Sequence, residues 1–304
     1  MPELTDPRGV LFFPVTPFDH RDRVDTDLLA EHLRTRLDHA PAGIFPACGT
    51  GEFHALTVGE YRDVLDTTVA VSDGRVPVVG GTGGPLGHAR QVAVEAEHAG
   101  ADALLILPPY LVGAPQAGLV AYVEAIAAVT ELPLIVYHRA NAALTPATVE
   151  VLLRNPRIIG FKDGVGDIAL AQQFVLAAER SGREDVLFFN GLLTAELSQA
   201  AYRAIGVPHY SSAVFAMAPT VANAFYAAYA DGDEGRQRKL LREFYAPLVQ
   251  LRDEVPGFAV SLVKAGVQLE GLPVGSVRAP LVDPDPEQLE RLRQLIDRGQ
   301  ELAS

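Results

Sequence analysis

Lys162 is the side chain of this sequence best suited to covalent chemistry. It follows the apolar run Arg157-Ile-Ile-Gly-Phe, which is typical of a buried β-strand. Burial disfavours the charged ammonium, so it lowers the pKa of a lysine and frees the amine as a nucleophile. A neutral amine condenses with a ketone to form an imine. A lysine at a strand end can also extend its ammonium into solvent, so Lys162 alone leaves both interpretations open.

A glycine-rich turn could hold the anionic part of such a substrate. The second predicted strand ends in Ala47-Cys-Gly-Thr-Gly-Glu. Backbone N–H groups around Gly49 and the hydroxyl of Thr50 could bind a carboxylate or a phosphate. The same Gly-x-Gly pattern also occurs in ordinary strand-to-helix connections, and that alternative stays open. We interpret the run 80–84, after the third predicted strand, first as a flexible loop and second as a ligand contact.

The end of the fifth predicted strand offers a proton relay and a cation. Tyr137 lies there, where a phenol can transfer protons, and Arg139 follows within reach of an anionic substrate. A packed aromatic ring and a solvated arginine are the equally simple alternative. His138 has no second histidine or carboxylate at ligand spacing, and we interpret His32 and His39 as surface residues of a helix. We therefore expect no metal site.

Two further predicted strands end in small or polar groups. The seventh ends in Asn190-Gly191, and the eighth ends in Tyr210-Ser-Ser, which includes Ser212. If all these strands belong to one barrel, their ends meet at a common rim. We expect Asn190, Gly191 and Ser212 to bind substrate there.

The elements that would position these residues alternate regularly. Most of the apolar runs are uninterrupted, as expected of strands that are covered on both faces of a parallel sheet. Between them lie helical patterns, such as the Thr57/Glu60 capping box and the run that stops at Gly100. The rival fold, a doubly wound open sheet, usually has Gly-x-Gly-x-x-Gly after its first strand, and no glycine follows that strand here. We predict eight strands, at 10–13, 43–47, 76–80, 103–107, 133–137, 157–161, 186–189 and 208–212.

Eight strands alternating with helices predict an α/β fold, a (β/α)8 TIM barrel. The pattern ends at Asp231-Gly-Asp-Glu-Gly, after which helical stretches are predicted at 234–254, 258–270 and 285–302. We therefore divide the chain into a catalytic barrel, residues 1–230, and a C-terminal helical extension, residues 231–304.

Composition narrows the class of protein. The net charge of −13 argues against a nucleic-acid-binding surface. A single cysteine, Cys48, excludes an internal disulfide and suits a reducing compartment. The first eight residues lack the basic and apolar segments of a signal peptide, and no apolar run is long enough to span a membrane. We expect a cytoplasmic protein with no nucleic-acid or membrane partner.

The chain resembles the superfamily of class I lyases that includes dihydrodipicolinate synthase and N-acetylneuraminate lyase. The resemblance covers nearly the whole chain and rests on the turn 49–52, on Tyr137 and on Gly160-Phe-Lys-Asp. It implies that Lys162 forms the imine, that Tyr137 relays protons, and that Gly49 and Thr50 hold the carboxylate of an α-keto acid.

Within that superfamily the chain is more similar to the 5-dehydro-4-deoxyglucarate dehydratase group. Dihydrodipicolinate synthases have a second relay tyrosine where Leu111 stands and a substrate-binding arginine where Ala142 stands. The chain also departs from the dehydratase pattern at Ala140, where that pattern has an acidic residue, and at Leu193, where it has proline. The similar segments are Leu11-Phe-Phe-Pro-Val-Thr-Pro-Phe, Cys48-Gly-Thr-Gly-Glu-Phe-His-Ala-Leu, Gly160-Phe-Lys-Asp-Gly-Val-Gly-Asp, Asn190-Gly-Leu-Leu-Thr-Ala-Glu, Tyr210-Ser-Ser-Ala-Val-Phe and Val260-Ser-Leu-Val-Lys-Ala-Gly.

The resemblance implies dehydration and decarboxylation of a keto-deoxy sugar diacid without metal or organic cofactor, and a homotetramer. Two alternatives stay open. One is an aldolase or dehydratase that acts on another 2-keto-3-deoxy sugar acid. The other is a catalytically silent barrel that senses sugar acids, which would have no need of the imine lysine.

Overall fold

Eight parallel strands form the barrel predicted from the sequence. The computed structural model describes residues 7–304, so most of the segment in which we expected no signal peptide lies outside the described residues. The strands run in the order β2-β1-β8-β7-β6-β5-β4-β3, and a parallel bridge between Ile44 and Val78 joins the two ends. The prediction of a (β/α)8 barrel is confirmed. The strands are β1 (Leu11–Phe12), β2 (Gly43–Ile44), β3 (Val79–Gly84), β4 (Ala103–Pro109), β5 (Leu134–His138), β6 (Ile158–Asp163), β7 (Leu187–Asn190) and β8 (His209–Ser212).

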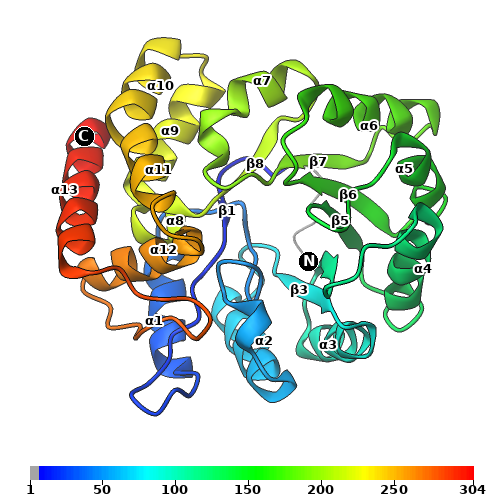
Figure 1. The fold of residues 1–304 in the computed structure, drawn as a ribbon, viewed down its shortest axis with the longest axis horizontal. Coiled ribbons are helices and arrows are strands. Elements are labelled where there is room, and N and C mark those ends of the chain that lie inside the picture. Colours follow the sequence, from blue (N-terminus) through cyan, green and yellow to red (C-terminus); the bar gives the residue numbers. More distant parts are fainter. Residues whose placement is uncertain (1–6) are drawn as a thin grey trace.

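The helices form a ring around these strands (Figure 1). Thr57 and Glu60 make the predicted capping box at the start of α2, and Gly100 ends α3 in the left-handed conformation. The barrel helices are α1 (Thr26–Leu37), α2 (Val58–Ser72), α3 (Leu86–Ala99), α4 (Gln116–Ala127), α5 (Pro146–Leu152), α6 (Ile168–Arg180), α7 (Gln199–Ala204), α8 (Val214–Met217) and α9 (Pro219–Ala230), with short 3-10 turns at Phe53–Ala55 and Ala195–Leu197.

Alternation along the strands divides the core into two layers. Side chains at every second position point into the barrel, as Ile135 and Tyr137 of β5 and Leu187 and Phe189 of β7 do. Their neighbours point outward and pack against the helices, as Val136 does. A residue near a strand end therefore reaches the barrel interior only if it has the right parity.

The third strand differs from the prediction. It spans Val79–Gly84, so the glycine run is part of the strand rather than a loop after it. The cause is close approach: a Cβ at Gly81 would lie 2.2 Å from the carbonyl oxygen of Ala47, and one at Gly83 would lie 2.7 Å from Cβ of Leu107. Only glycine lets β3 lie this close to its neighbours.

His32 also corrects a prediction, because it is fully buried on the inner face of α1. Its ring lies edge-on to that of Phe12, with the centroids 5.4 Å apart. Burial lowers the pKa of His32 to about 3, so the imidazole is neutral and packs as an apolar group.

The chain after residue 230 is helical and contains no strand. Its segments are α10 (Glu234–Leu240), a π-helical turn (Leu241–Tyr245), α11 (Ala246–Arg252), α12 (Phe258–Leu269) and α13 (Pro286–Ala303). They gather with α9 on one side of the barrel (Figure 1). None of the helices within residues 7–304 is both long and apolar enough to cross a membrane.

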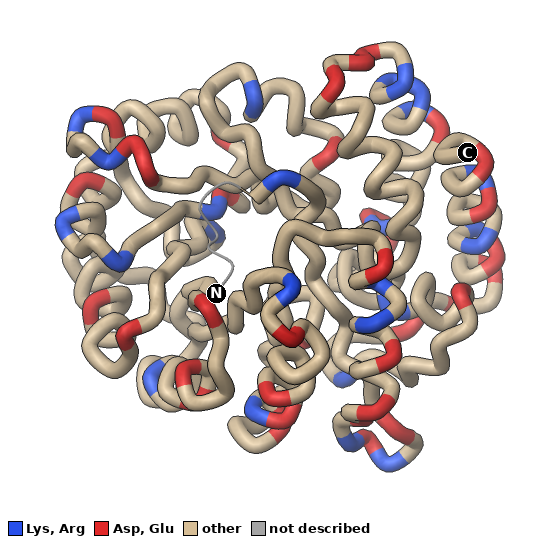
Figure 2. The backbone as a smooth tube through the Cα atoms, turned by 180° about the vertical axis from the view of Figure 1, so that it is seen from behind, with Lys and Arg blue, Asp and Glu red and all other residues tan. Residues whose placement is uncertain are grey.

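Acidic and basic residues alternate over the outer helices, and long stretches of the backbone between them carry no charge (Figure 2).

Candidate active site

A cavity of about 450 Å³ contains most of the residues singled out from the sequence. Its wall includes Lys162, Tyr137, Arg139, Gly191 and the turn 49–50. These residues come from the ends of β5 and β6 and from the loops after β2, β5 and β7, the rim at which a (β/α)8 barrel carries its active site.

Lys162 is the penultimate residue of β6 and points into the barrel. Only 8% of the residue is exposed. Its Nζ lies 4.3 Å from the ring centroid of Tyr137 and 4.7 Å from that of Phe13. Aromatic faces attract a cation without forming a fixed ion pair with it. The amine is thus held in place by neighbours that do not compete with a substrate ketone. Phe13, which directly follows β1, was not among the site residues predicted from the sequence.

Tyr137 lies beside Lys162 in the register of β5 and β6. Its hydroxyl donates to the carbonyl oxygen of Gly191 at 2.8 Å and accepts from Nη1 of Arg139 at 2.9 Å. Burial raises the pKa of Tyr137, but the charges of Lys162 and Arg139 outweigh it and leave this pKa below its ordinary value. A phenol that releases its proton more easily than usual suits proton transfer next to the amine.

Arg139 is a half-buried cation at the rim of the cavity. Its guanidinium binds the hydroxyl of Tyr137 and lies 5.6 Å from the centroid of that ring. Within residues 7–304 it pairs with no carboxylate, which leaves most of its donors available to an anion.

The turn after β2 presents Gly49 and Thr50 to the cavity. A Cβ at Gly49 would meet no protein atom within 4 Å, so packing does not require glycine there. Hydrogen bonds from the amides of Glu52 to Gly49 O (3.2 Å) and of Phe53 to Cys48 O (3.1 Å) close the turn.

Gly191 allows Lys162 to extend into the cavity. A Cβ at this position would lie 2.5 Å from Cγ and 2.6 Å from Cε of Lys162. The predicted substrate contact is thus also a space that the lysine side chain needs.

Asn190 and Ser212 do not reach the cavity, although we expected both to bind substrate. Their side chains point outward: Asn190 Nδ2 donates to Gln199 Oε1 at 3.1 Å, and Ser212 Oγ donates to Glu196 Oε1 at 2.5 Å. Alternation explains this, because each follows an inward-facing residue. Ser211, one position earlier, lines the cavity instead.

The C-terminal helices supply a wall that was not predicted. Residues of α11 and α12, among them Leu248, Phe258 and Val263, line the side opposite the strands. Arg252 of α11 also lines it and donates to Leu193 O and Thr194 Oγ1, both at 2.9 Å. The predicted catalytic unit, residues 1–230, therefore does not contain the whole cavity.

Other reactive groups of the chain are less suitable for catalysis. Lys264 does not line the cavity, and its Nζ is paired with Glu52 at 2.7 Å. Cys48 does line it, but burial raises the pKa of its thiol to about 12, so the thiol stays protonated. Residues 7–304 hold no group of three or more His, Cys, Asp or Glu side chains that could bind a metal ion.

Comparison with known proteins agrees with this geometry. The model of the dihydrodipicolinate synthetase family matches residues 6–298. The chain belongs to the dihydrodipicolinate synthetase family. The family resemblance predicted from the sequence motifs is thereby confirmed.

Similar members of this family carry one name. A probable 5-dehydro-4-deoxyglucarate dehydratase 2 of Streptomyces coelicolor is 53% identical over 97% of this chain and 90% of its own length. A probable 5-dehydro-4-deoxyglucarate dehydratase of Paracidovorax citrulli is 43% identical over 95% of both chains.

Solved structures of the family share the fold. The dihydrodipicolinate synthase of Oceanobacillus iheyensis has a TM-score of 0.88 at 24% identity and covers 98% of both chains. The 4-hydroxy-tetrahydrodipicolinate synthase of Methylacidiphilum fumariolicum has a TM-score of 0.85 at 26% identity and covers 97% of this chain and 96% of its own.

Proposed function

We propose that this chain is a decarboxylating dehydratase that converts 5-dehydro-4-deoxy-D-glucarate to 2,5-dioxopentanoate, CO2 and water. The observation that carries the proposal is the Lys162 amine at the base of the cavity, beside the hydroxyl-bearing ring of Tyr137. The names of the similar relatives supply the substrate.

In the proposed reaction the Lys162 amine attacks the C5 ketone, and water leaves as the imine forms. The imine acidifies C4, which loses a proton while the C3 hydroxyl departs as water. The C1–C2 bond then breaks, because its electrons flow through the conjugated system to the imine nitrogen, and CO2 is released. The C2 hydroxyl then loses its proton to become the aldehyde while C3 and C4 are protonated, and hydrolysis of the imine frees the product and restores the lysine.

The cavity offers a group for each task in this scheme. The C6 carboxylate, next to the imine, would lie on the turn 49–50, and the C1 carboxylate would face Arg139. Tyr137 would carry protons to and from the reacting carbons. We retain Asn190 and Ser212 as supports of the rim rather than substrate contacts, and we assign Ser211 in their place. The scheme needs an amine, a proton relay and anion holders, but no metal or organic cofactor.

We also propose a division of labour along the chain. Residues 1–230 would supply the reacting groups, and residues 231–304 would close the cavity. By family resemblance we propose a homotetramer, and the single buried thiol is compatible with a cytoplasmic location.

Borohydride trapping tests the imine directly. The chain has three lysines, Lys162, Lys239 and Lys264, so a reduced adduct has few possible sites. Incubation with substrate or pyruvate plus borohydride should modify Lys162, and Lys162→Ala should abolish both the adduct and turnover. Lys239, exposed on α10, provides the matched control, because Lys239→Ala should change neither.

Product analysis separates this reaction from its relatives. A panel of keto-deoxy sugar acids should yield CO2 only from the diacid.

In the trapping experiment, an adduct on Lys264, or no adduct at all, would refute the imine assignment. Release of pyruvate by C–C cleavage would establish an aldolase instead.

A further inference from the structure

We propose that Lys264 and Arg278, which lie far along the chain in the C-terminal region, are positioning residues for the carboxylate-binding turn 49–50. Neither lines the cavity. Lys264 acts through Glu52, which follows that turn, and Arg278 acts both through Glu52 and through the segments around it. The inference rests on the proposed function only in that the turn receives a substrate carboxylate.

The first contact is a fully buried ion pair. Lys264 of α12 places its Nζ 2.7 Å from Oε1 of Glu52, and the two side chains are 1% and 0% exposed. A buried carboxylate is costly unless every oxygen is satisfied. The backbone N–H of Arg278 supplies the second bond, 2.8 Å from Oε2. Glu52 is thus fixed at both oxygens by groups from beyond residue 260.

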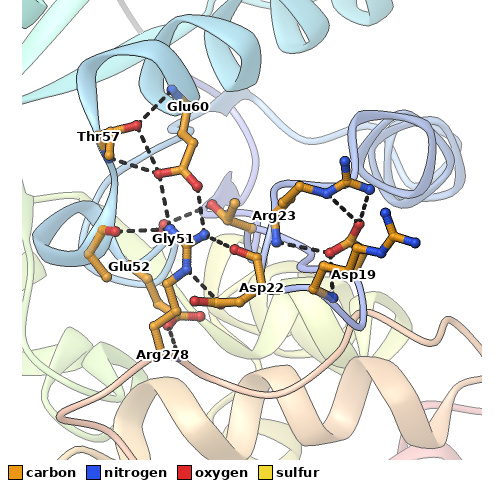
Figure 3. Close-up of polar contacts among 11 residues, drawn as sticks. Asp19, Asp22, Arg23, Gly51, Glu52, Thr57, Glu60 and Arg278 are labelled. Carbon is orange, nitrogen blue, oxygen red and sulfur yellow. Dashed lines mark hydrogen bonds and ion pairs between the residues drawn. The ribbon is translucent and has the colours of Figure 1, made fainter.

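The second contact is the Arg278 guanidinium, which joins three separate segments of the chain. It donates to Oε1 of Glu60 at 2.6 Å, to the carbonyl oxygen of Ala55 at 3.0 Å and to Oδ1 of Asp22 at 2.9 Å. Figure 3 shows these contacts converging from the start of α2 and from the loop before α1. The guanidinium therefore fixes the segment between the turn 49–50 and the start of α2.

Phe18 fills the space between the two cations. Its ring centroid lies 3.9 Å from Nζ of Lys264 and 4.0 Å from Cζ of Arg278. The amide of Phe18 donates to the carbonyl oxygen of Val274 at 3.0 Å. The two cations, the aromatic ring and the buried carboxylate form one compact cluster.

The turn depends on this unit because its own backbone is strained. Glu52 has a φ of 56°, a left-handed conformation that costs energy for a residue with a side chain. Gly51 is confined as well: its carbonyl accepts from Thr16 at 2.7 Å, and a Cβ there would lie 3.0 Å from the amide nitrogen of Ala47. Strained backbone persists only where its surroundings hold it. In the proposed arrangement the contacts of Glu52 and Arg278 hold Gly49 and Thr50 in a fixed position relative to Lys162.

Replacing the ion pair by neutral groups of similar size tests the proposal. The double variant Glu52→Gln with Lys264→Met leaves no unpaired buried charge, so it avoids the main cause of misfolding. Pyruvate serves as the probe, because its carboxylate would lie on the turn while its ketone reacts with Lys162. We expect the pyruvate concentration for half-maximal borohydride trapping to rise about tenfold or more, with the trapping rate at saturation changed less.

The matched control is an ion pair of the same region that lies away from the turn. Arg298 and Glu243 pair at 2.5 Å on α13 and the π-helical turn. The variant Glu243→Gln with Arg298→Met carries the same change of charge and should trap pyruvate as the wild type does.

A second variant guards against a double variant that does not fold. Arg278→Gln removes the guanidinium but keeps the backbone N–H that binds Glu52. We expect it to raise the half-maximal pyruvate concentration and to speed hydrogen exchange of the amides in residues 49–55.

Wild-type trapping at Lys162 must be seen first, since its absence would refute the proposed function itself. If the wild type is trapped and a folded variant of either kind keeps the wild-type pyruvate dependence, the positioning role is refuted. A lower melting temperature with unchanged pyruvate dependence has the same meaning, because it would show a purely structural role.

Discussion

The amine of Lys162 has aromatic rather than acidic neighbours. Phe13 and Tyr137 each present a ring within 5 Å of Nζ. A carboxylate in their place would form a fixed ion pair with the amine, whereas ring faces hold it without such a pair. This choice of neighbours suits a nucleophile.

The hydroxyl of Tyr137 can be tested apart from its ring. Tyr137→Phe keeps the stacking on Lys162 but removes the proton path, so we expect kcat to fall by ~10²–10⁴-fold. Borohydride should still trap pyruvate on Lys162. Tyr226→Phe, on α9 away from the cavity, serves as the control. A near-normal rate in Tyr137→Phe would make Tyr137 a packing residue.

Arg139 should act mainly on affinity for the diacid. It must bind the C1 carboxylate and yet release it as CO2, so we expect Arg139→Ala to raise KM more than it lowers kcat. Arg139→Lys keeps the charge but loses the bidentate guanidinium, so its KM should lie between those of the wild type and Arg139→Ala. Steady-state kinetics on the diacid and the matching mono-acid would check this. Equal turnover of both acids by the wild type would contradict the role.

Glu196 should make stability depend on pH. Burial raises the pKa of this carboxyl to about 7, well above its usual value. The folded state therefore binds a proton that the unfolded state releases, so its stability falls as pH rises from about 4.5 through 7. Glu196→Gln keeps a partner for Ser212 and removes this loss. We expect it to raise the free energy of unfolding at pH 8 by up to ~3 kcal/mol and to change it little at pH 4.5. Denaturant titrations at the two pH values would measure this, and an equal effect at both would contradict it.

At the scale of the elements, substitution by alanine should impair two glycines of the rim in different ways: one variant should lose imine formation and the other should lose affinity for substrate. Gly191→Ala would push against Lys162 and should suppress imine trapping even at saturating pyruvate. Gly49→Ala meets no protein atom, so it should leave the melting temperature unchanged. If the turn binds the carboxylate, the added methyl should raise KM. Wild-type KM in a stable Gly49→Ala variant would show that the carboxylate lies elsewhere.

The elements themselves were largely predictable from the sequence. Seven of the eight strands lie where apolar runs indicated them, since a run covered on both faces has a strong signal. The exception is β3, which contains glycines because neighbouring parts of the chain lie too close for a side chain. No local sequence pattern reveals such a contact. The prediction that Asn190 and Ser212 contact the cavity was not met for a related reason. A strand end can be located from sequence, but its inward parity depends on how neighbouring strands pair.

At the scale of the whole molecule, activity should not depend on a bound metal. Residues 7–304 contain no group of three or more His, Cys, Asp or Glu side chains that could hold a metal ion. We expect turnover to survive exhaustive treatment with EDTA, measured against untreated enzyme. Loss of activity that added Mg2+ or Zn2+ restores would overturn this and favour metal-assisted chemistry.

Contacts between distant parts of the chain could not be predicted from the sequence. The Gly-Thr-Gly-Glu turn was recognised, but Glu52 finds its partners 212 and 226 residues later. A single sequence contains no local pattern that pairs such distant positions. The cavity wall from α11 and α12 was missed for the same reason, because helical periodicity says which face is apolar but not what that face covers.

This separation has a consequence during synthesis of the protein. By the time β6 and Lys162 have left the ribosome, the partners of Glu52 have not yet been translated. The nascent barrel must therefore leave a carboxylate solvated where the finished protein buries it, with the anion turn unfixed until about residue 278 emerges. Contacts of such long range are slow to form. We expect a nascent chain to acquire its reactive lysine early and its affinity for substrate only as translation ends.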